Sequence, residues 1–226
     1  MTRTNLRVGC SPDDYDRYTA FGVEVYDQLL VDRLSLEAQR LGRARLRVVD
    51  ACTGTGQLLV RVASSPPFSD ATFMAFDLFE DMVAIAREHV RDAGLAERVR
   101  VDVADIHALP YANGSADLVM ARSVVHHWAD PLAAFREIER ILAPGGVAVI
   151  HEPRRDPSRQ AYEQAAEGRR RAGIRPVDLD EKYTAEEVRQ QLQAAGVRKW
   201  DVFAPEEGAG AIGFEVRIEK RALAER

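Results

Sequence analysis

Arg47 to Gly56 reads Arg-Val-Val-Asp-Ala-Cys-Thr-Gly-Thr-Gly, and this stretch decides the fold that we expect. A short apolar run ends in Asp50, small residues follow, and a helical pattern begins at Gln57. Open α/β sheets bind nucleotides where a buried parallel strand turns sharply into a helix. Gly54 and Gly56 permit positive φ and close approach of a ligand. Many turns contain glycine only because its backbone is flexible, so the two glycines alone do not establish a ligand site. The elements on either side of this stretch are needed to decide between a ligand site and a simple turn.

Strand and helix patterns alternate on both sides of this stretch, from residue 45 to residue 151. Such alternation is typical of parallel β-α units with right-handed crossovers. Further strands are expected at 71–76, 99–103, 116–121 and 147–150, and helices at 79–93 and 130–142. Outside this core we expect a polar arm at 1–14, one or two helices at 15–40, helices at 154–175 and from 184, and a hairpin of strands 200–203 and 214–218. This pattern predicts an α/β fold.

Composition excludes several classes of protein. The chain has 226 residues, 46% of them hydrophobic, and a net charge of -5, which argues against a general binder of nucleic acid or anionic membranes. Its two cysteines, Cys10 and Cys52, have no metal-ligand spacing, so we expect no disulfide framework and no metal site. No apolar stretch approaches membrane-spanning length. We therefore expect one cytoplasmic domain, and we expect it to be monomeric or homodimeric.

Three acids each end an expected strand, at Asp50, Asp77 and Asp105. Ligands of open parallel sheets bind outside the carboxyl ends of the strands, so these acids are predicted to share one edge. Asp77 lies 21 positions after Gly56, a spacing typical of an acid that binds a ribose diol. Acids at strand ends also cap helices, but three on one edge favour a ligand site.

This pattern resembles the class I S-adenosylmethionine-dependent methyltransferases, in particular the small-molecule, ubiquinone/menaquinone methyltransferase-like subgroup. The family's first motif, Asp/Glu-x-Gly-x-Gly-x-Gly, appears as Asp50-Ala-Cys-Thr-Gly-Thr-Gly56, with Cys52 at the first glycine. Further motifs match at 117–131 and 138–146, so the resemblance covers roughly residues 45 to 151. It implies a Rossmann-like sheet of seven strands, mostly parallel with an antiparallel last strand, and helices on both faces.

The resemblance also assigns cofactor residues. S-adenosylmethionine is the implied cofactor, with Asp77 on the ribose, Leu78 beside it, Met82 near the adenine, and Asp105-Ile106 on the adenine amino group. The complete set of expected cofactor-binding residues is Asp50, Cys52, Gly54, Gly56, Asp77, Leu78, Met82, Asp105, Ile106, Arg122 and Tyr18.

The acceptor side is less defined. His126 and His127 follow the fourth strand, and either can serve as general base, with His127 preferred; the alternative is that the pair positions the loop. Tyr15 and Tyr18 stand at the start of a segment that either closes over the ligand or only packs. Tyr15, Trp128, Glu152 and Arg154 are the expected substrate contacts. Within the one domain, 1–226, we expect a lid at 1–40, a cofactor core at 41–151, a substrate-side insertion at 152–183, and a C-terminal helix and hairpin at 184–226.

The predicted reaction is methyl transfer to a small or peptide-like metabolite by in-line displacement, and neither the acceptor nor the methylated atom is evident. One alternative is a protein of this fold that binds the cofactor or a ligand without methylating. A nicotinamide-dependent oxidoreductase is disfavoured, because Leu59 replaces the third glycine of Gly-x-Gly-x-x-Gly and Asp105 would have no role. Methylation of nucleic acid is disfavoured by the charge and by the absence of an Asn-Pro-Pro-Tyr-like motif.

Overall fold

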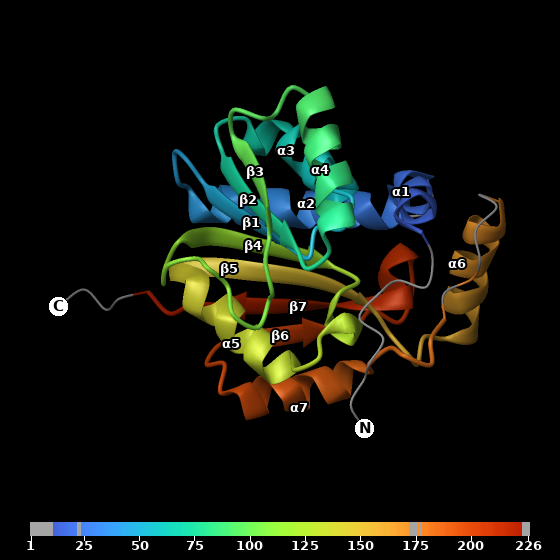
Figure 1. Cartoon of the computed structure of the whole chain (residues 1–226). Coiled ribbons are helices and arrows are strands. Elements are labelled where there is room, and N and C mark those ends of the chain that lie inside the picture. Colours follow the sequence, from blue (N-terminus) through green and yellow to red (C-terminus); the bar gives the residue numbers. More distant parts are fainter. Residues whose placement is uncertain (1–10, 22–23, 172–175, 177, 223–226) are drawn as a thin grey trace.

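The computed structural model describes residues 11–21, 24–171, 176 and 178–222. In these residues seven strands form one sheet in the order β3-β2-β1-β4-β5-β7-β6 (Figure 1). The strands are β1 (Arg47–Ala51), β2 (Thr72–Asp77), β3 (Val99–Val103), β4 (Ala116–Arg122), β5 (Leu142–Pro153), β6 (Trp200–Phe203) and β7 (Gly213–Glu219). β7 is antiparallel to both β5 and β6, whereas the other pairs are parallel. The predicted seven-stranded, mostly parallel sheet is therefore confirmed.

Helices cover both faces of the sheet. They are α1 (Pro12–Phe21), α2 (Glu24–Leu41), α3 (Gln57–Ala63), α4 (Glu80–Asp92), α5 (Pro131–Ile141), α6 (Arg159–Arg171) and α7 (Ala185–Ala195). The chain order reverses between β1 and β4, since β2 and β3 lie on one side of β1 while β4 and β5 lie on the other. A crevice at such a reversal is where doubly wound sheets bind ligands.

The N-terminal helix begins earlier than the sequence predicted. The expected polar arm reaches residue 14, but α1 already starts at Pro12. Ser11 acts as its cap, because its Oγ accepts the Asp14 N–H at 3.1 Å and proline is favoured in a first turn. Residues 1–10 of the expected arm lie outside the described residues.

The fifth strand is also longer than predicted. The glycine pair after Pro144 was expected to precede a strand at 147–150, yet β5 runs from Leu142 to Pro153. The extension pairs with neighbouring backbone on both sides: Leu142 lies opposite Ala116, and Gly145 N–H donates to the Lys220 carbonyl at 2.9 Å. The helix predicted at 154–175 is in turn shorter, because α6 begins only at Arg159.

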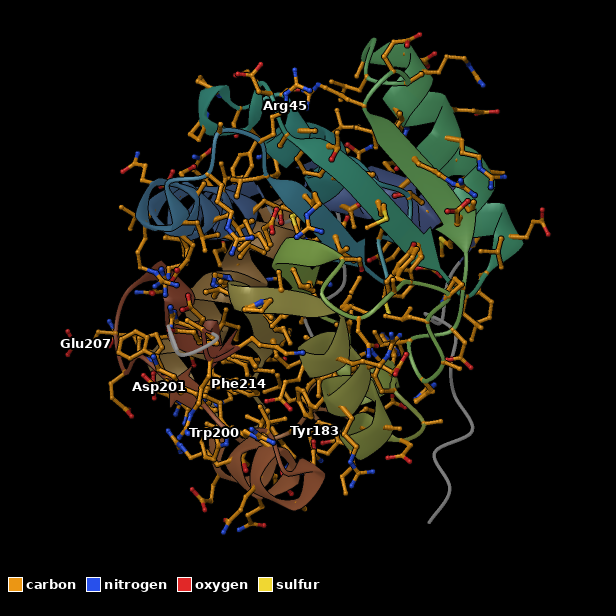
Figure 2. The ribbon with its side chains drawn as sticks, turned by 90° about the vertical axis from the view of Figure 1, so that its left-hand side faces the viewer. Arg45, Tyr183, Trp200, Asp201, Glu207 and Phe214 are labelled. Atoms are coloured by element: carbon orange, nitrogen blue, oxygen red, sulfur yellow. The ribbon has the colours of Figure 1, made fainter. Side chains whose placement is uncertain are left out.

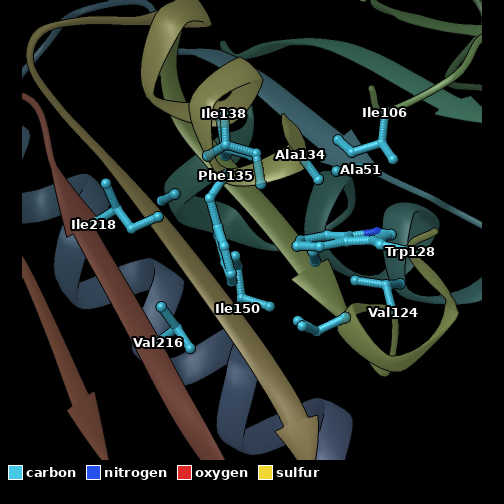
Figure 3. Close-up of a cluster of buried hydrophobic side chains, with 14 of the residues drawn as sticks. Ala51, Ile106, Val124, Trp128, Ala134, Phe135, Ile138, Ile150, Val216 and Ile218 are labelled. Atoms are coloured by element: carbon cyan, nitrogen blue, oxygen red, sulfur yellow. The ribbon is translucent and has the colours of Figure 1, made fainter. Parts of the chain in front are cut away.

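The two faces of the sheet bury separate apolar cores. On one face, Phe135 and Ile138 of α5 and Leu192 of α7 pack against β4, β5 and β7 (Figure 3). On the other, α2, α3 and α4 cover side chains of β1 to β4. Phe135 has no exposed surface, so its truncation to alanine would cost roughly 3–5 kcal/mol of stability. These cores fix the strand ends that carry the polar residues.

Local signals in the C-terminal third are confirmed. Thr184 and Glu187 form the predicted capping box of α7, and Gly196 ends this helix with φ 77°. Figure 2 shows Trp200 and Phe214 on neighbouring strands with Tyr183 nearby, beside α7. Tyr183 and Trp200 both pack against the apolar core.

α6 stands apart from the sheet, at the same end of the molecule as α1 (Figure 1). Among the described residues, no helix is both long and apolar enough to cross a bilayer.

Candidate active site

A cavity of about 240 Å³ lies at the carboxyl ends of the parallel strands. Its lining divides into two groups according to the strand that each residue follows. The β1–β3 half consists of Cys52, Gly54, Asp77, Leu78, Phe79, Met82, Ala104, Asp105, Ile106 and His107. The β4–β5 half consists of Arg122, Ser123, Val124, His126, His127, Trp128, Pro153, Arg169, Asp178 and Lys182. Tyr15 of α1 completes the lining.

Asp77 is the central acid of the β1–β3 half. It ends β2 and is buried, and its two carboxylate oxygens accept backbone N–H bonds from Gly54 at 2.9 Å and Phe79 at 3.1 Å. Burial raises the pKa of Asp77, and these N–H bonds offset that effect only in part. Gly54 has φ 57°, and a Cβ there would lie 2.9 Å from the Tyr15 ring. A side chain at position 54 would therefore strain the turn and force the Tyr15 ring to move.

Two non-glycine residues with positive φ line the cavity, one in each half. Cys52 and Ser123 both have φ 57°, and they are the non-glycine residues with this conformation in the described part of the chain. Cys52 occupies the first-glycine position of the motif, and Ser123 directly follows β4. Such conformations cost of order 1–3 kcal/mol and cluster at functional sites. The left-handed backbone at Cys52 is a conformation that glycine adopts readily, which accounts for the glycine of the motif that this stretch resembles.

Asp105 lies at the outer end of the β1–β3 half, where it binds His107. Its Oδ1 accepts the His107 backbone N–H at 2.9 Å and contacts His107 Nδ1 at 2.5 Å. His107 Nε2 accepts the Asp130 N–H at 3.1 Å, so the ring proton is on Nδ1, which donates a hydrogen bond to Asp105. Burial raises the pKa of Asp105, but the bonds from His107 outweigh it and the net pKa is lowered. Oδ2 of Asp105 takes no hydrogen bond from the described residues and remains available.

Several expected cofactor residues lie away from the cavity lining. Asp50 is buried beneath it, where the Thr53 hydroxyl donates to the carboxylate at 2.6 Å and burial raises the Asp50 pKa to about 7. Gly56 begins α3, and a Cβ there would lie 3.0 Å from Ala86 of α4. The two residues thus shape the turn from within. Tyr18 lies on α1, and its side chain falls outside what the structure describes.

Arg122 lines the β4–β5 half, and an ion pair with a buried acid holds its guanidinium in place. Its guanidinium pairs at 2.9 Å with Asp27, a fully buried acid of α2. Burial raises the pKa of Asp27, although the charge of Arg122 acts in the opposite direction. Because α2 supplies the partner, the position of Arg122 depends on an element remote in sequence.

The two histidines differ in their partners. His126 is buried, and its Nδ1 contacts Oε1 of the fully buried Glu152, which ends β5. Oε2 of Glu152 accepts the N–H groups of Val124 at 2.9 Å and Val125 at 3.0 Å. Burial acts to raise the pKa of Glu152, but the neighbouring His126 holds it below its usual value. The His127 ring lies against His126, with ring centroids 3.9 Å apart. The carboxylate therefore orients His126.

The expected substrate contacts are distributed unequally. Trp128 is buried, lines the cavity and packs edge-on against Phe135 with ring centroids 5.2 Å apart (Figure 3). Tyr15 also lines the cavity. Glu152 acts from behind His126, and Arg154 pairs with Asp156 at 2.9 Å outside the cavity lining.

Sequence reasoning missed part of the lining. His107, Ser123, Pro153, Asp178 and Lys182 were not singled out. Arg169, which also lines the cavity, belongs to a run of three arginines at 169–171. No local motif identifies the others, because they meet only through the fold. Among the described residues no group of three or more His, Cys, Asp or Glu side chains is arranged to hold a metal ion.

Comparison with known proteins agrees with this geometry. Residues 49–150 match the family described as a methyltransferase domain. The ubiquinone/menaquinone biosynthesis C-methyltransferase UbiE of Geotalea uraniireducens is 33% identical over 106 residues, which are 47% of this chain and 45% of that protein. The 27-O-demethylrifamycin SV methyltransferase of Amycolatopsis mediterranei is 31% identical over 142 residues, or 62% of this chain and 51% of that protein. The chain thus spans about half the length of the curated relatives it matches.

The fold has solved counterparts over nearly its whole length. The crystal structure of a SAM-dependent methyltransferase from Aquifex aeolicus superposes with a TM-score of 0.67 and 21% identity. The match covers 93% of this chain and 98% of that one. At this level of identity the similarity shows the fold, and the site must be argued from its own residues.

Proposed function

We propose that this chain, in which residues 49–150 form a class I S-adenosylmethionine-dependent methyltransferase domain, transfers a methyl group from that cofactor to a small-molecule acceptor. The observation that carries the proposal is the cavity itself, where Asp77 and Asp105 stand in one half and His126 in the other. The names of the two relatives support a small-molecule acceptor.

The β1–β3 half fits an adenosyl group. Each carboxylate oxygen of Asp77 accepts one backbone bond, which leaves each a second lone pair for a ribose hydroxyl. The free Oδ2 of Asp105 can accept from an adenine amino group. Apolar surface for a purine comes from Leu78, whose side chain is 41% exposed, and from Met82 and Ile106.

In the reaction the protein mainly orients the acceptor. When bound, S-adenosylmethionine supplies a methyl group on a positively charged sulfur that is already electrophilic. The residues of the β4–β5 half hold the acceptor atom in line with that methyl group and exclude water. Trp128 and Val124 give this half its apolar wall.

His126 is the proposed general base. Its Nδ1–H donates to Glu152, which fixes the tautomer in which Nε2 is unprotonated and can accept a proton. The geometry therefore favours His126 over His127, the residue that the sequence put slightly ahead. An acceptor that arrives deprotonated needs no base, and the histidine–glutamate pair would then only hold the loop after β4.

Calorimetric titration tests the proposal directly. We expect one-to-one binding of S-adenosylmethionine and of S-adenosylhomocysteine, and no heat from NADH. Tight binding of NADH, with no heat from either adenosyl ligand, would overturn the assignment of the cavity.

A further inference from the structure

Lys182 is a cation of the cavity that the proposed mechanism does not use. It precedes α7, is half-buried, and lines the β4–β5 half. Its ammonium makes no hydrogen bond or ion pair with any residue that the structure describes. Since no described residue contacts this half-buried ammonium as a counter-ion, an anionic group of a ligand would supply one.

The nearby carboxylates do not neutralise Lys182 by contact. Burial lowers its pKa, and the charges of Glu152, Glu181 and Asp178 offset this effect only partly. The Glu152 oxygens are already occupied by His126 and two backbone N–H groups. Asp178 and Glu181 are exposed, and Asp178 accepts the Asp180 N–H at 3.0 Å.

Two further cations, Arg122 and Arg169, line the same half. Arg169 comes from α6. Arg122 is paired with Asp27 at 2.9 Å, and the lining of this half contains one carboxylate, that of Asp178. The single ammonium of Lys182 suits a monoanion such as a carboxylate better than a phosphate dianion.

We infer that the acceptor carries a carboxylate, and that the ammonium of Lys182, with Arg169 beside it, binds this group in the β4–β5 half of the cavity. That this ligand is the methyl acceptor rests on the proposed function, whereas the carboxylate subsite rests on the cavity alone. Lys182 is in this view a determinant of acceptor specificity.

Matched pairs of aromatic ligands test the subsite. 4-Hydroxybenzoate with 4-hydroxybenzamide, and 1-naphthoate with 1-naphthamide, are titrated into the protein with and without saturating S-adenosylhomocysteine. Because a hydrogen bond to a charged group is strong, each carboxylate is expected to bind about tenfold or more tightly than its amide. Lys182→Gln should reduce that preference to less than about twofold, and Lys182→Arg should restore most of it.

Lys199→Gln is the matched control, because it removes the same charge from an exposed residue that pairs with Glu219 at 2.7 Å. This variant should keep the preference for the carboxylate. Lys182→Gln should also melt at or above the temperature of the parent, since it removes an uncompensated cation; a large drop would indicate a structural role and contradict the inference.

Equal affinities within both pairs, a preference that survives Lys182→Gln, or no binding of either carboxylate at about 10 mM would overturn the subsite. Failure here while S-adenosylhomocysteine still binds leaves the proposed function standing. A preference that depends on Lys182 in a protein that does not bind S-adenosylhomocysteine would support the subsite and contradict the methyltransferase assignment.

Discussion

The two halves of the cavity are built in different ways. Most of the β1–β3 half lies in the turns that follow three neighbouring strands; Asp77 ends β2, and Asp105 lies two residues after β3. The β4–β5 half gathers residues from the turn after β4, the end of β5, α6 and the segment before α7. The residues of the β1–β3 half can be predicted from local sequence patterns, because they belong to consecutive strand–turn–helix units. The residues of the β4–β5 half come from distant segments and meet only when the whole chain packs.

The polar groups of the two halves differ as well. Carboxylates dominate the β1–β3 half, and cations and imidazoles dominate the β4–β5 half. This division implies that substitutions in one half should alter cofactor binding, whereas substitutions in the other should alter the acceptor or the chemistry. The following predictions test that separation.

The largest effect is expected from His126→Ala. With an acceptor found by screening, the turnover number should fall by about 10²–10⁴-fold, because the proposed base is lost, while affinity for S-adenosylhomocysteine stays unchanged. The measurement is the rate of S-adenosylhomocysteine formation across pH.

His127→Ala is the matched control and should change turnover by less than about tenfold. If both variants turn over at the parental rate at every pH, the acceptor needs no base and the β4–β5 half acts through positioning alone.

Asp77→Ala should produce the largest effect in the β1–β3 half. Loss of hydrogen bonds to two ribose hydroxyls should weaken binding of S-adenosylhomocysteine by roughly 2–4 kcal/mol. Asp105→Ala should cost less, since one amino group is released. Calorimetry gives the affinities, and a thermal melt confirms folding.

Asp178→Ala is the control from the β4–β5 half, and cofactor affinity should not change. If Asp77→Ala binds as tightly as the parent, the ribose assignment is wrong. An equal loss in Asp178→Ala would remove the separation between the halves.

Asp50 lies below the boundary between the halves and should make stability depend on pH. Its folded pKa, about 7, exceeds the value of about 3.9 for an unfolded chain, so the folded state holds the extra proton between these values. Stability should therefore fall as pH rises from about 4 to 7, by up to about 1.4 kcal/mol per pH unit for this group.

Asp50→Asn should flatten that dependence when the free energy of unfolding is measured in urea at several pH values. Asp105→Asn is the opposite case, since the pKa of Asp105 is lowered and its contribution is present above the unfolded pKa and lost on acidification. Identical pH profiles for the parent and Asp50→Asn would show that Asp50 is not held in its protonated form.

The smallest effects are expected in the two turns that contain a non-glycine residue with positive φ, one after β1 and one after β4. Cys52→Gly and Ser123→Gly each relieve a φ of 57° but add freedom to the unfolded chain, so each should change stability by no more than about 1 kcal/mol. A β-branched residue fits this conformation poorly, so Cys52→Val and Ser123→Val should both be destabilising.

Chemical denaturation of the four variants gives the comparison. If valine is tolerated at either position, the backbone there is not constrained to the left-handed region. A marked difference between positions 52 and 123 would show that one half of the cavity is more rigid than the other.

Much of the fold was predictable because its signals are local. The strands predicted at 99–103 and 200–203 have the same bounds as β3 and β6. Asp130 caps α5 through the Ala133 N–H at 3.1 Å, and Thr184 caps α7. The start of α1 was predicted too late, and the cause is local, because Ser11 caps the helix. The start of β5 was also predicted too late, and the cause is non-local, because pairing with a residue beyond β7 extends the strand through two glycines.

The three acids could be predicted from the sequence to lie near strand ends at one edge of the sheet, because parallel strands in one sheet must point the same way. The sequence did not determine which acid faces the cavity. Asp77 does so and Asp50 does not, since the turn after β1 places Gly54 against Asp77 and leaves Asp50 underneath.

The acceptor side was decided by tertiary structure. His126 and His127 are equivalent as neighbours in sequence, and only the end of β5 brings Glu152 to one of them. Lys182 has no motif around it and reaches the cavity because the segment before α7 returns to the end of β5, where Arg154 forms a bridge with Tyr183. Local patterns specify the residues that follow strands, whereas pairing between residues remote in sequence requires the packed chain.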